Sequence, residues 1–333
     1  MKLSNKTWAK PMSFILLAIL LVILFMVSIN LGSIKVGFFE LIKGIFDGQS
    51  SDVNAIKDLR FPRIIISMLA GAALATSGAL LQAVLKNPLA DPGIIGVSSG
   101  AGFFAIIATV LFPQFYFIAP AVAILGGIFA FALVYTLASK QGLSPIRILL
   151  VGIAVQALFT GLSSSINTMS GSDLSGVASI VEGNITLKTW SDVSMLAWYV
   201  IPTLIVAVCL AKKCDLIQLE DKTVRSLGIN IDHLRIIISL IAVILASSAT
   251  AIVGIVSFLG LLVPHIARLF VGSTNKYLLP FSAVLGAFIF LLADTVGRTI
   301  ASPYEINAAV IMSVVGGPVF IFLLRRSSKI YGK

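Results

Sequence analysis

Charged residues are scarce in this chain. Asp, Glu, Lys and Arg make up 11% of its 333 residues, and 58% of the residues are hydrophobic, whereas soluble domains carry about 25% charged residues. A soluble fold of this size could not bury so much apolar surface, so the composition excludes a soluble globular protein and indicates a membrane protein. The formal net charge of +10 follows the predicted membrane topology and does not indicate nucleic-acid binding.

Residue types that bind metals are also rare. The chain holds two cysteines, Cys209 and Cys214, and two histidines, His233 and His265, which lie far apart in the sequence. This pattern favours reduced cysteines without a role in metal binding. The sequence contains no G-x-x-x-x-G-K-[ST] phosphate loop, so the chain cannot itself be a P-loop ATPase. We therefore expect no catalytic residue, no bound cofactor and no metal site in this chain.

Long uncharged stretches, in contrast, are abundant. A bilayer crossing needs about 20 apolar residues in a helix. Eight stretches lack Asp, Glu, Lys and Arg: 11–34, 64–85, 92–139, 148–172, 193–211, 236–267, 277–293 and 306–324. Because two of them can be divided, the sequence predicts an all-α polytopic membrane protein with about ten transmembrane helices, including short broken helices. No change of composition marks a linker, so residues 1–333 are expected to form a single integrated transmembrane domain.

The two longest stretches predict the short helices. The third contains Pro113 and Pro120, where one helix should end and the next begin. The sixth holds one full span and then a short segment interrupted by Gly260 and Pro264. Interrupted segments in corresponding positions of two halves are typical of transporters built from inverted repeats.

The basic residues predict the orientation in the cell (cytoplasmic) membrane. Ten spans place both termini on one side, and most of the 24 Lys and Arg residues fall on that side. The positive-inside rule therefore predicts that both termini are cytoplasmic. The first span has a basic start like a signal peptide, but no small-x-small cleavage site follows Asn30, so we expect it to remain uncleaved.

One sizeable loop, about residues 212–235, lies on the predicted cytoplasmic side. Three of its apolar residues share one face of a short helix: Ile217, Val224 and Leu227. Gly228 is placed to end that helix, and Asn230 or Asp232 could cap the next one. The loop is thus a candidate docking element for a cytoplasmic partner, and an ordinary solvated loop is the alternative.

The second predicted span begins with two arginines. Arg60 and Arg63 flank Pro62, a residue that fits the first turn of a helix. Cations at this position face the positive end of the helix dipole, and on the outer side they oppose the positive-inside bias. An acidic docking partner would offset both effects, and contact with lipid phosphates is the alternative. Further along, the span carries small residues on one stripe, a pattern for close helix packing: Gly71, Ala75, Gly78 and Gln82.

Fixed charge is almost absent from the middle of the spans. Asp294 and Arg298 lie four residues apart near the outer end of one span, a spacing that allows them to pair, and Glu305 follows in the outer turn. Ion-coupled carriers usually keep acidic residues or histidine at the midplane. The scarcity of such residues argues against an ion-coupled secondary transporter, which remains the alternative from another class together with a receptor or scaffold that moves nothing.

Several blocks resemble the permease subunits of ABC importers for iron-siderophores, haem and cobalamin. They are Leu-Arg-Phe-Pro-Arg at 59–63, the small-residue run at 71–78, Lys-Asn-Pro-Leu-Ala-Asp-Pro at 86–92, Pro-His-x-x-Arg within 258–268 and Gly-Gly-Pro at 316–318. The blocks cover nearly the whole chain in the family's order. The family usually has the elements Trp-x-x-Gly-Ser, Asp-His-Arg and Glu-x-Pro at three places. This chain has different residues there, at 180–184, 274–276 and 305–307 respectively.

The resemblance implies a machine of several chains. The permease would pair with a second permease, as a homodimer or heterodimer, around a central pathway. Two cytoplasmic ATPase subunits would bind and hydrolyse ATP, and an extracytoplasmic substrate-binding protein would deliver the ligand. The expected substrate is an Fe(III)-siderophore, with haem or cobalamin as the alternatives within the family.

The resemblance also assigns roles to three groups of residues. Binding-protein docking is assigned to Arg60, Arg63 and Arg298, and each of the three is expected to lie near water. Contact with the ATPase is assigned to Arg225, Ser226, Leu227 and Gly228. The cytoplasmic gate region falls on Leu143, Ser144 and Pro145.

Overall fold

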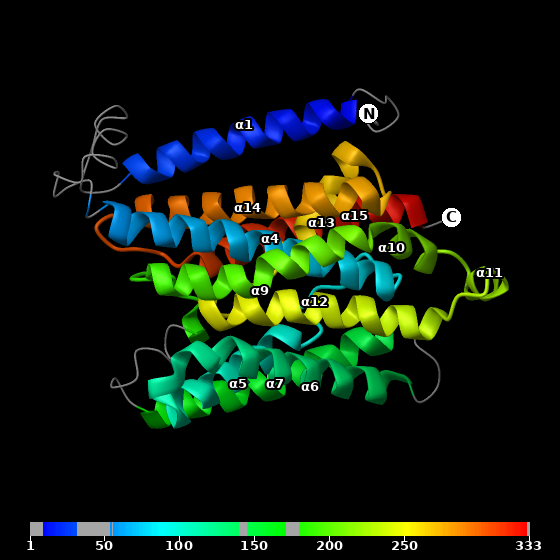
Figure 1. Cartoon of the computed structure of the whole chain (residues 1–333), viewed down its shortest axis with the longest axis horizontal. Coiled ribbons are helices and arrows are strands. Elements are labelled where there is room, and N and C mark those ends of the chain that lie inside the picture. The colour runs from blue at the N-terminus through cyan, green and yellow to red at the C-terminus, as the bar shows by residue number, and fades with distance from the viewer. Residues whose placement is uncertain (1–8, 32–53, 55, 140–144, 171–179, 332–333) are drawn as a thin grey trace.

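The computed structural model describes residues 9–31, 54, 56–139, 145–170 and 180–331. These residues form helices and connecting segments, and none of them forms a strand (Figure 1). The helices are α1 (Ala9–Asn30), η2 (Ile56–Arg60), α4 (Phe61–Val84), α5 (Val97–Leu111), η3 (Pro113–Ile118), α6 (Ala119–Ser139), α7 (Pro145–Ser170), α9 (Trp190–Cys209), α10 (Ala211–Ile217), α11 (Asp221–Ser226), α12 (Ile231–Val253), α13 (Leu259–Val271), α14 (Asn275–Thr299) and α15 (Ala308–Tyr331). The predicted all-α class is confirmed.

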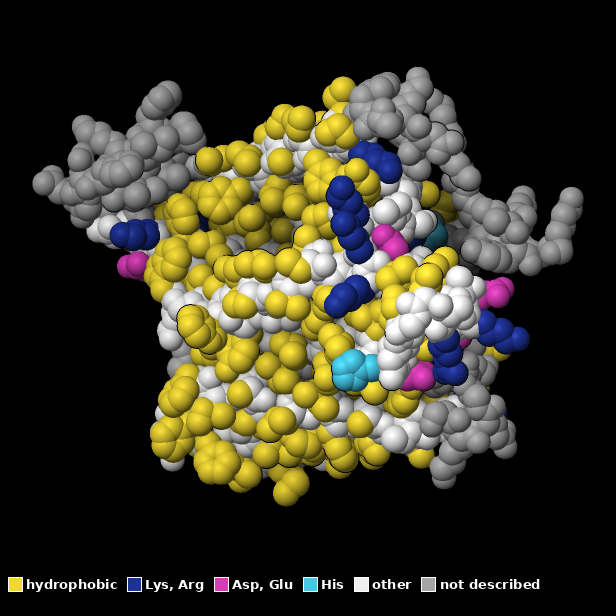
Figure 2. All heavy atoms as spheres, turned by 45° about the vertical axis from the view of Figure 1, so that its right-hand side comes forward, with side chains coloured by type: hydrophobic (Ala, Val, Ile, Leu, Met, Phe, Trp, Pro, Cys, Tyr) yellow, Lys and Arg dark blue, Asp and Glu magenta, His cyan; other side chains and the backbone are white. Residues whose placement is uncertain are grey.

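Ten apolar helices make up the bundle. Within the described residues, seven helices are long and apolar enough to cross a membrane, and three shorter apolar segments lie at Val97–Leu111, Leu259–Val271 and Ala308–Phe322. The described part of the chain thus confirms about ten spans with short helices among them. Figure 2 shows the apolar side chains in a broad belt, with Lys and Arg gathered mainly toward one end of the bundle.

The break before the short helix α13 differs from the prediction. Gly260 and Pro264 lie inside α13, and the chain breaks earlier, between Gly254 with a φ of 75° and Phe258 with a φ of 68°. Pro264 is tolerated in the helix because its missing N–H frees only the carbonyl four residues earlier. That carbonyl, of Gly260, accepts a hydrogen bond of 3.2 Å from the side-chain amide of Gln82.

Helix α4 lies at the centre of the bundle and is buried along nearly its whole length. The predicted stripe on it is where neighbouring helices approach most closely. A Cβ atom added to Gly71 would collide with the backbone carbonyl of Gly286 on α14, and one added to Gly78 would collide with the carbonyl of Gly260 on α13. Close backbone contact of this kind is how helices associate in lipid, where the hydrophobic effect does not drive them together.

The bundle has two distinct ends. The α11 end holds α10, α11, the start of α1 and the end of α15 (Figure 1), which agrees with an even number of crossings. The opposite end, where α4 starts, is called the Arg63 end below. At the α11 end, Cys209 is exposed and Cys214 is buried, and burial followed by the charge of Asp215 raises the pKa of the Cys214 thiol to about 12.

Candidate functional site

A buried charge cluster lies at the Arg63 end. Arg63, in the first turn of α4, donates from Nε and Nη2 to Oδ1 of Asp294 on α14, at 3.0 and 2.8 Å. Its Nη1 donates to Oε2 of Glu305 at 2.7 Å. The side chains of Arg63 and Asp294 are only 8% and 0% exposed. One guanidinium therefore joins the start of α4, the end of α14 and the turn that follows α14.

Arg298 extends the cluster to α1. Its Nε lies 3.4 Å from Oδ2 of Asp294, which confirms the pairing predicted from their spacing. Its Nη2 donates to the hydroxyl of Ser28 at 2.6 Å and to the Ser28 carbonyl at 3.2 Å. Ser28 carries no charge or motif that would mark it, and sequence reasoning missed it.

The environment expected for the three arginines is wrong in part. We expected each of them near water, but Arg63 is buried and the Arg298 side chain is 9% exposed. Arg60 is half-buried and donates from Nη1 to the carbonyl of Ile29 at 2.7 Å. The expectation failed because the carboxylates that bury Arg63 follow it by 231 and 242 residues. Arg63 thus has protein carboxylates as partners, and the lipid-phosphate alternative is not needed for it.

Glu305 links this cluster to the segment before α9. Its Oε2 also accepts a hydrogen bond of 3.3 Å from the hydroxyl of Thr186. Burial opposes ionisation, but the hydrogen bond and charge of Arg63 hold the pKa of Glu305 below its usual value. Close by, Nδ2 of Asn307 donates to the backbone carbonyl of Glu182 at 3.1 Å. Two hydrogen bonds therefore tie residues 182–186 to residues 305–307.

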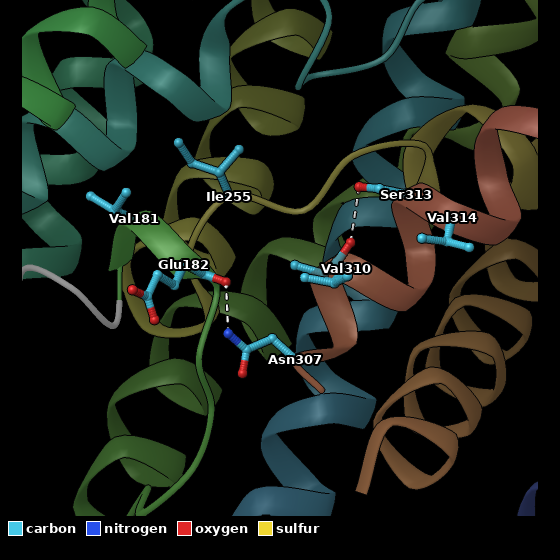
Figure 3. Close-up of a pocket in the computed structure, with 8 residues that line it drawn as sticks. Val181, Glu182, Ile255, Asn307, Val310, Ser313 and Val314 are labelled. Atoms are coloured by element: carbon cyan, nitrogen blue, oxygen red, sulfur yellow. Dashed lines mark hydrogen bonds between the residues drawn. The ribbon is translucent and has the colours of Figure 1, made fainter. Parts of the chain in front are cut away.

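A groove opens beside this connection (Figure 3). Its volume is about 520 Å³. Val181, Glu182, Ile255, Asn307, Ala309, Val310, Ser313 and Val314 line it. The sequence marked residues 180–184 and 305–307 only as departures from a family pattern, and the structure brings these two segments together here.

At the α11 end, the loop folds as two short helices instead of the single helix expected. Gln218–Glu220 separates α10 from α11. Ile217 and Val224 are buried, but Leu227 is 60% exposed, because α11 ends at Ser226 and Leu227 lies just beyond the helix. Gly228 has a φ of 77°, which confirms it as the residue after the helix end. The Asn230 side chain accepts from the N–H of His233 at 3.1 Å, so Asn230 is the cap of α12.

Charged contacts connect α11 to the long helices. Oδ1 of Asp221 accepts from Nζ of Lys86 and from Nη2 of Arg235, both at 2.9 Å. These hydrogen bonds, above all the one from Lys86, lower the pKa of Asp221. Because Lys86 follows α4 and Arg235 lies in α12, α11 is joined to both helices. Sequence reasoning missed these contacts, although the family block at 86–92 includes Lys86.

A second contact holds α10. Oδ1 of Asp215 accepts from the backbone N–H and the side-chain amide of Asn275, each at 2.8 Å. Asp215 thereby satisfies a free donor in the first turn of α14. Of the predicted gate residues, Pro145 begins α7, whereas Leu143 and Ser144 lie outside the described residues. Within the described ranges, no group of three or more His, Cys, Asp or Glu side chains could hold a metal ion.

These features define a class: a polytopic membrane protein with broken helices, uncharged span centres and short polar helices at one end. The model of the FecCD transport family matches residues 20–326. The chain therefore belongs to the FecCD transport family, and it is a permease subunit of an ABC importer in the cell membrane. Permease subunits of this family are not themselves catalytic.

Relatives and solved structures agree with this assignment. The chain is 40% identical over 329 residues to the Probable heme-iron transport system permease protein IsdF of Staphylococcus aureus strains MSSA476 and Newman, covering 99% of each chain. It matches a metal-chelate type ABC transporter in an inward-facing conformation with a TM-score of 0.80, 27% identity and coverage of 95% of this chain and 99% of that one. PsaBC from Streptococcus pneumoniae shares the fold, with a TM-score of 0.55 at 13% identity and coverage of 84% and 93%.

Proposed function

We propose that this permease moves an Fe(III) chelate across the cytoplasmic membrane. An Fe(III)-siderophore is the first candidate, as the sequence blocks suggest. Haem is the second, and the observation that favours it is the 40% identity with a haem-iron permease over 99% of both chains. Cobalamin remains the third candidate within the family. Transport of either iron chelate requires energy. Separate ATPase subunits supply this energy.

The proposed assembly contains this chain, a second permease, two ATPase subunits and a binding protein. In the proposed orientation, the α11 end and both termini face the cytoplasm, and the Arg63 end faces the binding protein. The excess of basic residues at the predicted cytoplasmic side supports this orientation. The contacts of α11 with Lys86 and Arg235 support its role as the ATPase contact, since they connect it to α4 and α12.

Uptake of radiolabelled iron tests the substrate and the energy source together. Cells with and without this gene receive Fe(III)-siderophores, haem or labelled cobalamin. Gene-dependent uptake that stops on ATP depletion and survives an uncoupler is expected for at least one iron chelate. Uptake abolished by the uncoupler at normal ATP would instead indicate an ion-coupled carrier, and gene-dependent uptake of cobalamin alone would refute the iron assignment.

The binding protein is proposed to dock at the Arg63 end. Arg60, Arg63 and Arg298 outnumber the carboxylates of Asp294 and Glu305, so this cluster itself carries one net positive charge, which suits an acidic partner. Because the structure buries Arg63 and Arg298 in pairs, reversing either would also disturb folding. Arg60, which is half-buried, is the arginine to test.

Reversing the charge of Arg60 is expected to weaken docking. Arg60→Ala should cost roughly 1 kcal/mol of binding free energy, and Arg60→Glu should cost more and reduce the salt dependence of the remaining binding. Binding of the purified partners, measured over a range of salt concentrations, gives both quantities. Lys57→Glu makes the same charge change at an exposed residue of the same short helix, η2. Equal losses for the two variants would mean that only overall charge matters and would contradict a docking role for Arg60.

Gly228 is expected to be required for coupling. Its φ of 77° suits glycine and is strained for a β-branched residue, while no atom lies within 4 Å of an added Cβ. Gly228→Val should therefore weaken ATPase co-purification or uncouple hydrolysis from uptake in proteoliposomes. Gly228→Asn is the matched control, because asparagine tolerates this conformation. Normal coupling in Gly228→Val at normal expression would argue against this loop as the ATPase contact.

A further inference from the structure

Glu182 is an acidic side chain in the groove at the Arg63 end, and none of the roles above uses its carboxylate. The residue is exposed, and no residue in the described part of the chain forms an ion pair or hydrogen bond with the carboxylate. Its backbone is fixed, because its carbonyl accepts from Asn307. Figure 3 shows the carboxylate turned away from Asn307, and Glu182 is one of the residues that line the groove.

The wall around Glu182 is closely packed and is built where helices end. Gly183 is packed so closely that a Cβ atom there would lie 2.7 Å from Cβ of Ala309 at the start of α15. Ile255 comes from the break between α12 and α13. Non-helical backbone in a membrane protein is tolerated where it is buried in protein or lines a water-filled space.

Three polar residues among the eight that line the groove indicate that it faces water. Beside Glu182, the wall presents Asn307 and the exposed Ser313 of α15. A carboxylate without a partner is too costly to face lipid tails. In a cleft with low-dielectric walls, a fixed charge acts strongly on the ions that enter. Such a wall suits the path of a polar solute.

We propose that this groove forms part of the wall along which the chelate passes, and that Glu182 makes the pathway favour neutral or cationic Fe(III) chelates over anionic ones. The inference rests on the proposed function, since it concerns how one iron chelate is preferred over another. Glu182 repels the negative charges of a tricatecholate complex or of haem propionates, and it leaves a neutral trihydroxamate complex unaffected. It is a specificity-determining residue, and docking at Arg60 is independent of it.

The test compares uptake by four chains reconstituted with the same ATPase and binding protein. They are the unaltered chain, Glu182→Gln, Ser313→Asp and the control Asp58→Asn, which removes an exposed carboxylate of η2 at the same end. The probes are a neutral Fe(III) trihydroxamate, a trianionic Fe(III) tricatecholate and haem. Selection by the binding protein is common to all four chains and cancels when each variant is compared with the unaltered chain.

Glu182→Gln should raise tricatecholate uptake about threefold to tenfold relative to trihydroxamate uptake, as expected for one charge acting on three through mostly aqueous surroundings. Haem should respond in the same direction but less. Ser313→Asp, which adds a carboxylate to the groove, should have the opposite effect, and Asp58→Asn should leave the ratio unchanged. If the binding protein delivers only one anionic complex, uptake of that complex should rise in Glu182→Gln and fall in Ser313→Asp.

Three outcomes would overturn the proposal. They are an anionic complex taken up equally by all four chains, an equal change for neutral and anionic complexes in Glu182→Gln, and the same response in Asp58→Asn. If the unaltered chain takes up none of the iron complexes, the proposed function fails instead, and the result is distinct from a failed charge preference.

Discussion

Replacing Arg63 with alanine is expected to lower the free energy of unfolding by roughly 3–5 kcal/mol, the usual cost of removing one partner from a buried ion pair. The substitution leaves Asp294, whose side chain is 0% exposed, without its two hydrogen bonds from Arg63. It also separates α4 from Glu305. Thermal unfolding of the purified chain in detergent measures the loss. Arg63→Lys should recover only part of it, because one ammonium group cannot reproduce the three directed N–H groups.

Two further variants test whether the buried ion pair of Arg63 with Asp294 is the cause of this loss of stability. Arg225 pairs with Asp232 at 3.2 Å, but the side chains are 63% and 61% exposed, so Arg225→Ala should change the free energy of unfolding by less than about 1 kcal/mol. Asp294→Asn in the Arg63→Ala background should restore part of the stability, since it removes the unpaired buried charge. Equal losses for Arg63→Ala and Arg225→Ala would show that the cluster contributes no more than a surface pair.

A leucine in place of Gly78 is expected to prevent the bundle from packing. The new side chain would meet the backbone of Gly260, which cannot rotate away as a side chain can. Overpacking costs about 1–3 kcal/mol where neighbouring side chains can adjust, and here the backbone of α13 must move, so the loss should exceed that range. The fraction of monodisperse protein on gel filtration after extraction from the membrane measures the effect.

Gly161 of α7 provides the matched control for Gly78. Both glycines lie in long apolar helices, but no atom lies within 4 Å of a Cβ added to Gly161. Gly161→Leu should therefore leave the yield of folded chain nearly unchanged. Similar losses at both positions would mean that helix composition decides the outcome, and the close contact between α4 and α13 would not explain it.

Local features of this protein could be predicted from its sequence. The uncharged stretches gave the number of spans, because the length of a bilayer crossing is fixed. Gly228 and Asn230 were recognised because helix ends require particular residue types. The pairing of Asp294 with Arg298 followed from their spacing along one helix. Each of these depends on residues close together in the chain.

Contacts between distant segments could not be predicted in the same way. Arg63 was expected near water, since nothing near it in the sequence shows that Asp294 will cover it. The break before α13 lies earlier than predicted, since the helix contains Pro264 and the carbonyl that Pro264 leaves free is bound by Gln82 of α4. Leu227 does not share the buried face of Val224, because α11 ends at Ser226 and the sequence does not show that the helix stops there. In each case the deciding partner lies in another helix or at an unexpected turn.

The different burial of the two cysteines has a practical consequence for observing this transporter at work. The chain contains only Cys209 and Cys214, and the Cys214 thiol is fully buried, with its pKa raised to about 12. A thiolate is the species that reacts with maleimides, so a fluorescent or spin label at neutral pH will attach to the exposed Cys209. Such a label sits where α9 ends and α10 begins, and it would report movement of the α11 end during a transport cycle in the unmutated chain.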